Sequence, residues 1–476
     1  MPPFVTLTNV KAEIHNSPFT ESINWQINQG EIWSVTGPNG SGKSLLADII
    51  CGRFLIIRGS IGYHFFNFES DKPGNKIKTI RFDSVFSLAD YRNSYYQLRF
   101  NNPDDDVAPF VSSLFTQSWK GNCELAGILK LLDIEKLADR RLVELSSGEL
   151  RRFLIARILF DEPAMLIFDN PFIGLDVESR QNLDEIFPHI AASGIQMLFL
   201  VPEGSKMPGC TTHVLEMKNC ELTSANTVGA FLNQQTANNQ TTHVSVDWCR
   251  LPLLPDISYD IAVKMEKITI AYGGRNVCRN LDWTVKKGEK WALLGPNGSG
   301  KSTLLSYIYA DNPRSYAEGL TLFGSRRGSG ESIWEIKQRI GFTSSEMHLY
   351  YRKKTSCLEV VESGLFDSVG LYRTTHGEER QIAAYIMECL LIGSIKNRIF
   401  SEVSSGEQKM VLFARALVKN PELLILDEPY NQLDNLNKTL CEGFLNAFCA
   451  QAGKTLIFVT HWKDEIPACA DKYLNL

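Results

Sequence analysis

The octapeptide GPNGSGKS occurs twice in the chain, at residues 37–44 and again 258 residues later at 295–302. Four further landmarks repeat at the same offset, namely WQINQGEIW and WTVKKGEKW from Trp25 and Trp283, ELSSGEL and EVSSGEQ from Glu144 and Glu402, Asp169 and Asp427, and GLD and QLD at 174–176 and 432–434. Five landmarks in one register indicate a tandem duplication of about 230 residues per copy. The chain is therefore expected to fold as two similar domains.

Composition is that of an ordinary globular protein. The 476 residues, of which 44% are hydrophobic and 22% charged, suffice for two or three cores. The net charge of -5 gives no basic field, so a nucleic-acid partner is not expected. The 11 cysteines form no C-x-x-C pair and are expected to be reduced thiols rather than metal ligands.

Location follows from the absence of targeting signals. No apolar run approaches the ~18 residues of a membrane span. The start, MPPFVTLTNV, resembles no signal peptide. We expect a cytoplasmic protein, and any membrane partner that holds it at the inner face of the membrane must be a separate chain.

Both copies show the same order of expected elements. Alternating apolar segments precede the Gly-rich loop and a helix, and SSGE, a helix and short apolar strands follow. Strands of this kind alternating with helices predict an α/β fold with a mostly parallel sheet. We predict domains at 1–225 and 259–476, joined by a polar linker at 226–258, with a strand pair around 211–222 in the first domain.

The motif G-x-x-x-x-G-K-[ST] follows an expected strand and opens an expected helix in both copies, which makes a chance Gly-rich turn an unlikely alternative. Backbone N–H groups of such a loop converge on nucleotide phosphates. Lys43 and Lys301 are expected to reach the β- and γ-phosphates, and Ser44 and Ser302 to bind Mg²⁺. The predicted nucleotide-binding residues are Gly37, Pro38, Asn39, Gly40, Ser41, Gly42, Lys43, Ser44, Gly295, Pro296, Asn297, Gly298, Ser299, Gly300, Lys301, Ser302 and Thr303.

Asp169 and Asp427 each end an apolar strand. This fits the acidic residue that helps to hold Mg²⁺ in P-loop NTPases. A helix N-cap or turn aspartate is the alternative, and the shared register disfavours it.

Taken together, GPNGSGKS, LSSGE at 145–149, VSSGE at 403–407, LILDEP at 424–429 and VTH at 459–461 resemble the nucleotide-binding domains of ABC ATPases. The resemblance implies two tandem P-loop NTPase domains of the ABC type, each with a helical subdomain. Residues 350–373 and a weakened first copy are most similar to the ModF-type tandem ATPases, which are named for molybdate transport or photorepair.

The same resemblance implies ATP hydrolysis with Mg²⁺ in a head-to-tail sandwich of the two domains. One site then combines Lys43, Ser44 and Asp169 with Ser404 and Gly406, and the other combines Lys301, Ser302 and Asp427 with Ser146 and Gly148. The segments that resemble the family signature are Ser146, Ser147, Gly148 and Glu149, and Ser404, Ser405, Gly406 and Glu407. Each SSGE also suits an N-capping serine, which does not conflict with that role.

The two copies differ where the chemistry should occur. Glu428 can orient or deprotonate the attacking water, whereas Asn170 cannot accept a proton. His461 resembles the family's switch histidine, although an ordinary strand-end histidine is the alternative, and the offset places Glu203 opposite it. Tyr272 resembles the residue that stacks on adenine, where the first copy has Ile14. We predict that Glu428, His461 and Lys301 are catalytic, and that the first site binds ATP weakly or without hydrolysis.

One departure from the family concerns the glutamine after the third strand. The second copy has Ser345 there and the first has Ser87 at the same offset, while Gln97 lies off register. Turnover and coupling to a membrane partner are therefore expected to differ from those of ordinary importers.

Three functions compete. The first is an ATPase that energises a separate membrane permease, possibly for molybdate, docked on helical regions near 88–140 and 346–400; tandem sugar-importer ATPases belong to this class. The second is a soluble factor that acts on ribosomes or another cytosolic assembly and resembles ABC-F proteins, although the short polar linker and Asn170 depart from them. The third is DNA repair or chromosome work, for which zinc modules and coiled coils are missing. The sequence does not identify a transported substrate or the direction of transport.

Overall fold

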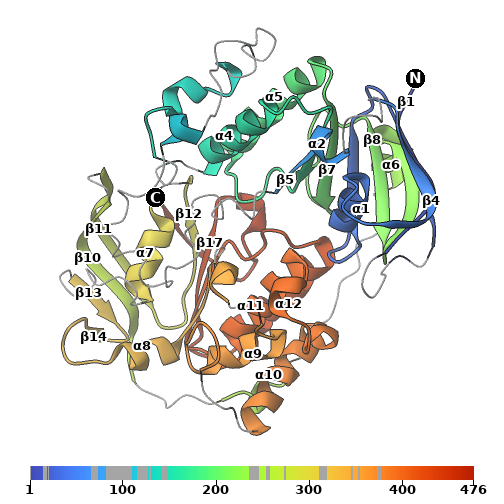
Figure 1. Ribbon diagram of the computed structural model, residues 1–476. Helices are drawn as coiled ribbons and strands as arrows, with labels where there is room; N and C mark the ends of the chain where they lie inside the picture. Colours follow the sequence, from blue (N-terminus) through green and yellow to red (C-terminus); the bar gives the residue numbers. More distant parts are fainter. Residues whose placement is uncertain are drawn as a thin grey trace. The chain divides into compact units, whose positions relative to one another are not determined.

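The computed structural model describes residues 2–13, 19, 21–65, 73–81, 110–114, 127, 130–141, 145, 147–234, 246–252, 258–272, 275–297, 299–309, 319–344, 347–351, 354–372, 375 and 377–476. These residues form two compact units, one up to residue 234 and the other from residue 246 onward (Figure 1).

The first unit contains two sheets. An antiparallel sheet has the order β2-β1-β4, and a six-stranded sheet has the order β5-β6-β7-β3-β8-β9, in which β9 alone runs antiparallel to its neighbour. The strands are β1 (Pro3–Ala12), β2 (Ile23–Asn28), β3 (Trp33–Gly37), β4 (Ile56–Tyr63), β5 (Ile77–Arg81), β6 (Met165–Asp169), β7 (Gln196–Pro202), β8 (His213–Lys218) and β9 (Glu221–Thr227). The helices are α1 (Lys43–Ile50), α2 (Pro73–Lys76), α4 (Ser147–Leu159), α5 (Val177–Ala192) and α6 (Val228–Gln234), with 3₁₀ turns η4 (Val111–Leu114) and η5 (Ile134–Leu137).

The second unit repeats this plan. An antiparallel sheet has the order β11-β10-β13-β14, and a parallel sheet has the order β15-β16-β17-β12-β18. The strands are β10 (Ile261–Tyr272), β11 (Arg275–Lys286), β12 (Lys290–Leu294), β13 (Gly319–Leu322), β14 (Ser325–Arg326), β15 (Ile340–Thr343), β16 (Leu423–Asp427), β17 (Thr455–Thr460) and β18 (Lys472–Asn475). The helices are α7 (Lys301–Ile308), α8 (Ile333–Arg339), α9 (Cys357–Glu362), α10 (Gly377–Cys389), α11 (Ser405–Leu417) and α12 (Asn435–Cys449). Short 3₁₀ turns are η8 (Trp248–Arg250), η10 (Met347–Tyr350), η11 (Ser363–Leu365), η12 (Gly393–Ile395), η13 (Phe400–Glu402) and η14 (Lys463–Glu465).

Sequence pattern explains the central strands. Every residue of β16 and β17 is buried, as expected for parallel strands that are covered on both faces. The helices that follow β6 and β16 start at aspartates, because Asp176 accepts a hydrogen bond from Ser179 N (2.8 Å) and Asp434 accepts one from Asn437 N (2.9 Å). The predicted α/β fold is confirmed, and β8 and β9 form the strand pair expected around 211–222.

Strand pairing shows that one offset does not relate all parts of the two units. Asp169 pairs with Leu200, and Asp427 pairs with Val459, so β7 and β17 differ by 259 residues. Ile80 pairs with Phe168, and Thr343 pairs with Leu426, so β5 and β15 differ by 263. The constant offset of 258 therefore misplaces residues around these two strands.

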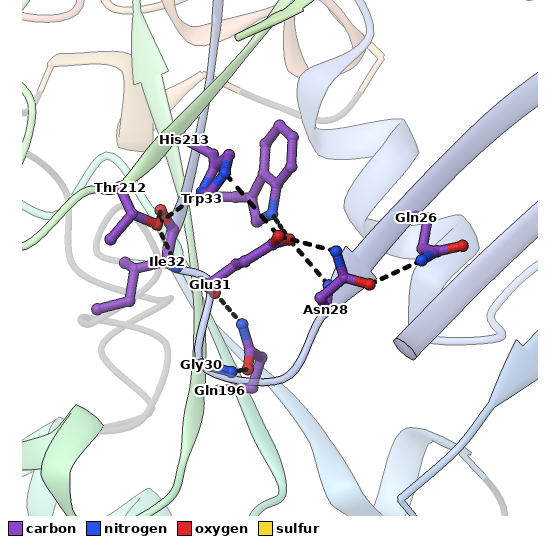
Figure 2. A network of polar contacts seen from close by, with 9 residues as sticks. All are labelled: Gln26, Asn28, Gly30, Glu31, Ile32, Trp33, Gln196, Thr212 and His213. Atoms are coloured by element: carbon purple, nitrogen blue, oxygen red, sulfur yellow. Dashed lines mark hydrogen bonds and ion pairs between the residues drawn. The ribbon is translucent and has the colours of Figure 1, made fainter. Parts of the chain in front are cut away.

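Polar contacts of the Glu31 carboxylate fix the turn that leads into β3 (Figure 2). Glu31 accepts hydrogen bonds from Asn28 N (2.9 Å), Asn28 Nδ2 (2.8 Å) and Trp33 Nε1 (2.9 Å), and its Oε1 lies 3.9 Å from His213 Nε2 on β8. Gln196 joins the same turn to β7, because Gly30 N donates to its Oε1 (3.1 Å) and its amide donates to the Glu31 carbonyl. The second unit has the same design, with Glu289 bonded to Trp291 Nε1 (2.9 Å) and Lys472 Nζ (2.5 Å).

Replacing Glu31 with Gln should loosen this turn at neutral pH. Burial alone raises the pKa of Glu31, but hydrogen bonds from Asn28 and Trp33 outweigh it and lower the pKa below 4.5. A lowered folded pKa contributes stability above the unfolded value that is lost as pH falls through the folded value. We expect E31Q to lower the local opening free energy by ~1–3 kcal/mol at pH 7 and by less near pH 4. Hydrogen exchange of peptides covering β2 and β3 measures this, and the exposed Glu185→Gln is the control. An equal effect at both pH values would contradict the role of the charge.

A buried ion pair closes the helical part of the second unit. Lys419 bonds to Asp367 and donates to the Lys337 carbonyl (2.6 Å), and the side chains of Lys419 and Asp367 are 6% and 4% exposed. Arg415 lies beside it and donates to Ser363 Oγ (3.2 Å) and to the Ser368 carbonyl (3.0 Å). These cations connect α11 with the segments that follow α9 and with α8.

Candidate functional site

The phosphate loop of the second unit lies between β12 and α7. Lys301 is 6% exposed, and its ammonium donates to the carbonyls of Gly295 (2.6 Å) and Pro296 (2.8 Å). Gly300 adopts φ 91°, and a Cβ on Gly295 would approach the carbonyl oxygen of Leu476 to 2.9 Å, so glycine is needed at both positions. The loop thus has the conformation that a phosphate-binding loop requires, and the Lys301 ammonium is fixed by two carbonyls of the loop.

Two oxygen donors that suit Mg²⁺ meet beside this loop. Ser302 Oγ at the start of α7 donates to Asp427 Oδ2 at the end of β16 (3.1 Å). Burial, followed by the negative charge of Glu428, raises the pKa of Asp427 to about 7. A hydroxyl and a carboxylate in a site that gathers negative charge fit a hard divalent cation.

Glu428 is fixed next to this pair by two side chains. Its Oε1 accepts a hydrogen bond from His461 Nδ1 (3.1 Å), and its Oε2 accepts one from Asn431 Nδ2 (2.6 Å). Burial alone raises the pKa of Glu428, but the hydrogen bond and charge of His461 and the charge of Lys301 outweigh it, so the pKa is lowered. An ionised, oriented carboxylate is what a general base requires.

His461 presents a second nitrogen to the site. Because Glu428 accepts at Nδ1, that nitrogen carries the proton. The Nε2 atom is buried and has no hydrogen-bond partner among the residues that the structure describes, and the side chain is 3% exposed. When the imidazole also carries a proton at Nε2, this buried group can donate to a ligand oxygen such as that of a terminal phosphate.

The first unit keeps the cradle. Lys43 Nζ donates to the carbonyls of Gly37 (2.7 Å) and Pro38 (2.8 Å), and Ser44 Oγ donates to Asp169 Oδ2 (3.1 Å). Gly42 has φ 92°, close to the 91° of Gly300 in the other unit. The geometry for holding phosphates is thus present in both units.

The first unit lacks the side chains that surround Glu428 in the second unit. Asn170 stands where Glu428 does, and its amide donates to Asp169 Oδ1 (3.2 Å). Ile173 replaces Asn431 at the same offset. The expectation that Glu203 corresponds to His461 is wrong, because the strand register makes Pro202 the counterpart. The exposed Glu203 therefore does not oppose a phosphate from that position, and proline has no side-chain donor.

The first unit also gains a cation. Arg81 ends β5 beside Asp169, with its Nε 4.0 Å from Asp169 Oδ2, and its terminal nitrogen donates to both oxygens of Asp48 at 2.8 and 2.9 Å. The register makes Ser344 its counterpart, so the offset that paired Ser87 with Ser345 is wrong for this strand. Ser87, Ser345 and Gln97 lie outside the described residues.

The signature segments open helices as expected. Ser404 caps α11, accepting from Glu407 N (3.3 Å) while Glu407 Oε2 accepts from Ser404 N (2.7 Å). Residue Gly148 lies in the first turn of α4, where a Cβ would meet Ser179 Oγ at 2.9 Å. Ser146, Gly298 and Ile14, and the side chains of Ser147 and Tyr272, lie outside the description. Their roles remain predictions.

Sequence reasoning missed three site residues. Asn431 was detectable, because Ile173 replaces it at the offset that had already been found. Arg81 was hidden, because the change of offset before β5 removes the alignment on which the comparison depended. Asp48 keeps the offset of 258 and aligns with Ser306, but only its contact with Arg81 reveals its place in the site.

Comparison with known proteins places this geometry in a wider group. The sequence pattern of the ABC transporter family matches residues 20–173 and 278–431. The ABC transporter ATP-binding protein ModF of Escherichia coli is 34% identical over 93% of this chain and 90% of its own length. An uncharacterized ABC transporter ATP-binding protein of Schizosaccharomyces pombe is 29% identical over 100% of this chain and 98% of its own length.

Solved structures support the fold. A complex of the archaeal ribosomal stalk protein aP1 with the archaeal ribosome recycling factor aABCE1 matches with a TM-score of 0.52 and 19% identity, over 94% of this chain and 83% of that one. At this identity the likeness concerns the fold alone. Within the described ranges, no helix is long and apolar enough to cross a membrane.

Proposed function

Because this chain belongs to the ABC transporter family as a tandem ATPase, we propose that its second site hydrolyses ATP while its first site holds nucleotide without cleaving it. ABC ATPases generally use ATP with Mg²⁺, and Ser302 and Asp427 are the residues that would hold the metal at the second site. Glu428 orients and deprotonates the attacking water, Lys301 contacts the transferred phosphate, and His461 Nε2 stabilises it.

One observation carries this asymmetry. Glu428 is bonded to both His461 (3.1 Å) and Asn431 (2.6 Å), whereas the first unit has Asn170, Pro202 and Ile173 in the corresponding places. The amide of Asn170 cannot accept the proton of water. The P-loops, in contrast, agree in both lysine contacts and in the serine–aspartate bond of 3.1 Å. Binding is therefore common to both sites and hydrolysis belongs to one.

Hydrolysis at the second site energises a separate integral membrane protein. The support is the naming of the relatives as ABC transporter ATP-binding proteins. Molybdate is the substrate class that the resemblance to ModF-type ATPases implies.

The partner is tested by purification of Glu428→Gln from its source cells in the presence of ATP. Glutamine retains the size of the side chain but not the base, so ATP stays bound and the complex that it stabilises persists. We expect an integral membrane protein in stoichiometric amount. Lys301→Ala, which removes the phosphate contact of the same site, is the matched control and should retain much less of it.

Other outcomes decide between the candidate functions. Ribosomal particles in place of a membrane protein would overturn the transport proposal and favour a soluble ABC factor. The same partner recovered equally with Lys301→Ala would show that its binding does not depend on nucleotide at the second site.

A further inference from the structure

Arg81 lies where the first unit would be expected to hold a metal. It is the last residue of β5 and pairs with Asp169, the last residue of β6. Its Nε is 4.0 Å from the same Asp169 oxygen that accepts the Ser44 hydroxyl at 3.1 Å. A permanently charged guanidinium therefore stands beside the two oxygen donors that would bind Mg²⁺.

The position of this guanidinium is fixed by a second carboxylate. Asp48 lies on α1, one turn after Ser44, and accepts from Arg81 at both oxygens (2.8 and 2.9 Å). Asp48 also pairs with Arg53 at 2.5 Å, so its own charge is shared between two cations. Arg81 is thus held between Asp48 of α1 and Asp169 of β6, and its side chain is 37% exposed.

The second unit has neither residue of this pair. Ser306 is the counterpart of Asp48, and Ser344 takes the place of Arg81. The carboxylate of Glu428 is replaced by the amide of Asn170. The first unit also gains the carboxylate of Asp48, but that carboxylate is paired with Arg53 as well as Arg81, and Arg81 is the group that lies 4.0 Å from Asp169. The loss of the Glu428 carboxylate and the guanidinium next to Asp169 both disfavour a divalent cation there.

We propose that the first site binds the nucleoside triphosphate without a divalent cation, with Arg81 supplying the positive charge beside Lys43. A guanidinium pairs well with phosphate oxygens and needs no dehydration of a metal ion. This inference rests on the proposed role of the first P-loop as a nucleotide holder, and it adds the ionic form of the ligand. The two sites of one chain then differ in metal requirement as well as in hydrolysis.

The test measures ATP binding to the full chain by calorimetry in Mg²⁺ and in EDTA. Lys301→Ala removes binding at the second site, so only the first site reports, and Lys43→Ala gives the converse chain. We expect the Kd of the first site for ATP to change less than ~3-fold when Mg²⁺ is removed. The Kd of the second site should rise at least ~10-fold, which is the effect of losing one strong charged contact.

A second pair of variants isolates the guanidinium in the Lys301→Ala chain. Arg81→Ser, which copies the second unit, should weaken binding in EDTA at least ~10-fold, and Arg81→Lys should weaken it less because the charge remains. Three results would overturn the inference. The first site could bind ATP ~10-fold or more tightly in Mg²⁺ than in EDTA. Arg81→Ser could bind ATP in EDTA as tightly as the chain with Arg81, or the first site could bind no ATP in either buffer.

The test of metal-free binding can fail independently of the proposed difference in hydrolysis between the two sites. A first site that needs Mg²⁺ but does not hydrolyse leaves the functional asymmetry intact and removes only the metal-free inference. ATP cleavage by the Lys301→Ala chain would instead remove the functional asymmetry, whatever its binding shows.

Discussion

Replacing Glu428 with Gln is expected to lower ATP turnover of the whole chain by ~10²–10⁴-fold, the usual contribution of a general base. The carboxylate has two fixed partners, His461 at 3.1 Å and Asn431 at 2.6 Å, and glutamine fills the same space without accepting the proton. ATP affinity should change little, because the phosphate loop and Lys301 remain. Steady-state phosphate release measures the loss, and binding of ATP measured separately shows that the site is still occupied.

The first unit offers the matched control. Asn170→Gln alters the same position beside Asp169 and should change turnover by less than ~3-fold, because this site does not supply a base. Equal losses from the two variants would contradict the division of labour, since both sites would then contribute to hydrolysis. A loss of less than ~10-fold in Glu428→Gln would show that another group activates the water.

Replacing Asp367 with Ala should destabilise the second unit by ~3–5 kcal/mol, because it leaves a buried charge without its partner. The side chain of Lys419 is only 6% exposed, and burial, opposed by Asp367, lowers its pKa to about 8. Urea unfolding of the second unit, followed by hydrogen exchange of α11, measures the effect. The exposed Asp464→Ala is the control, with an expected change within ~0.5 kcal/mol.

The effect of Asp367→Ala on stability should depend on pH, because Lys419 titrates. The pKa of Lys419 is lower in the folded chain than its ordinary value of 10.5, so the unfolded chain binds more protons between about pH 8 and 10.5. Stability contributed by this group therefore rises with pH in that window. Because Asp367 holds this pKa up, its removal lowers the pKa of Lys419 further, so the loss in Asp367→Ala should shrink as pH rises toward about 8 and stay constant above it. The double variant with Lys419→Met should recover most of the loss. A loss that is independent of pH and survives in the double variant would point to packing rather than charge.

The fold and most of the second site were predictable from local chemistry. A glycine-rich loop after an apolar strand, and an aspartate at the end of another, mark Lys301, Ser302 and Asp427 in the sequence, and the parallel sheet brings the two elements together. Glu428 and His461 are likewise adjacent to strand ends that the sequence marks clearly. The structure brings these residues together with contacts of 2.6–3.1 Å, and their roles stay predictions.

Features that depend on strand register could not be predicted in this way. Insertions before β5 and near β7 change the spacing between the copies, and a shift of one residue exchanges Glu203 for Pro202 opposite His461. Arg81 reaches Asp169 only because two parallel strands end at the same level. A repeat in the sequence carries no information about such pairing once the spacing varies.

The backbone at the two diverged positions has a thermodynamic consequence. Glu428 has φ 51° and Asn170 has φ 52°, so both stand in the left-handed region although their chemistry differs. Asparagine tolerates this region well, whereas most other residues lose ~1–2 kcal/mol there. The second unit accordingly carries local backbone strain at Glu428, and the first unit is relieved of it by Asn170. The exchange of acid for amide that we propose to separate the two sites therefore also stabilises the folded loop of the first unit.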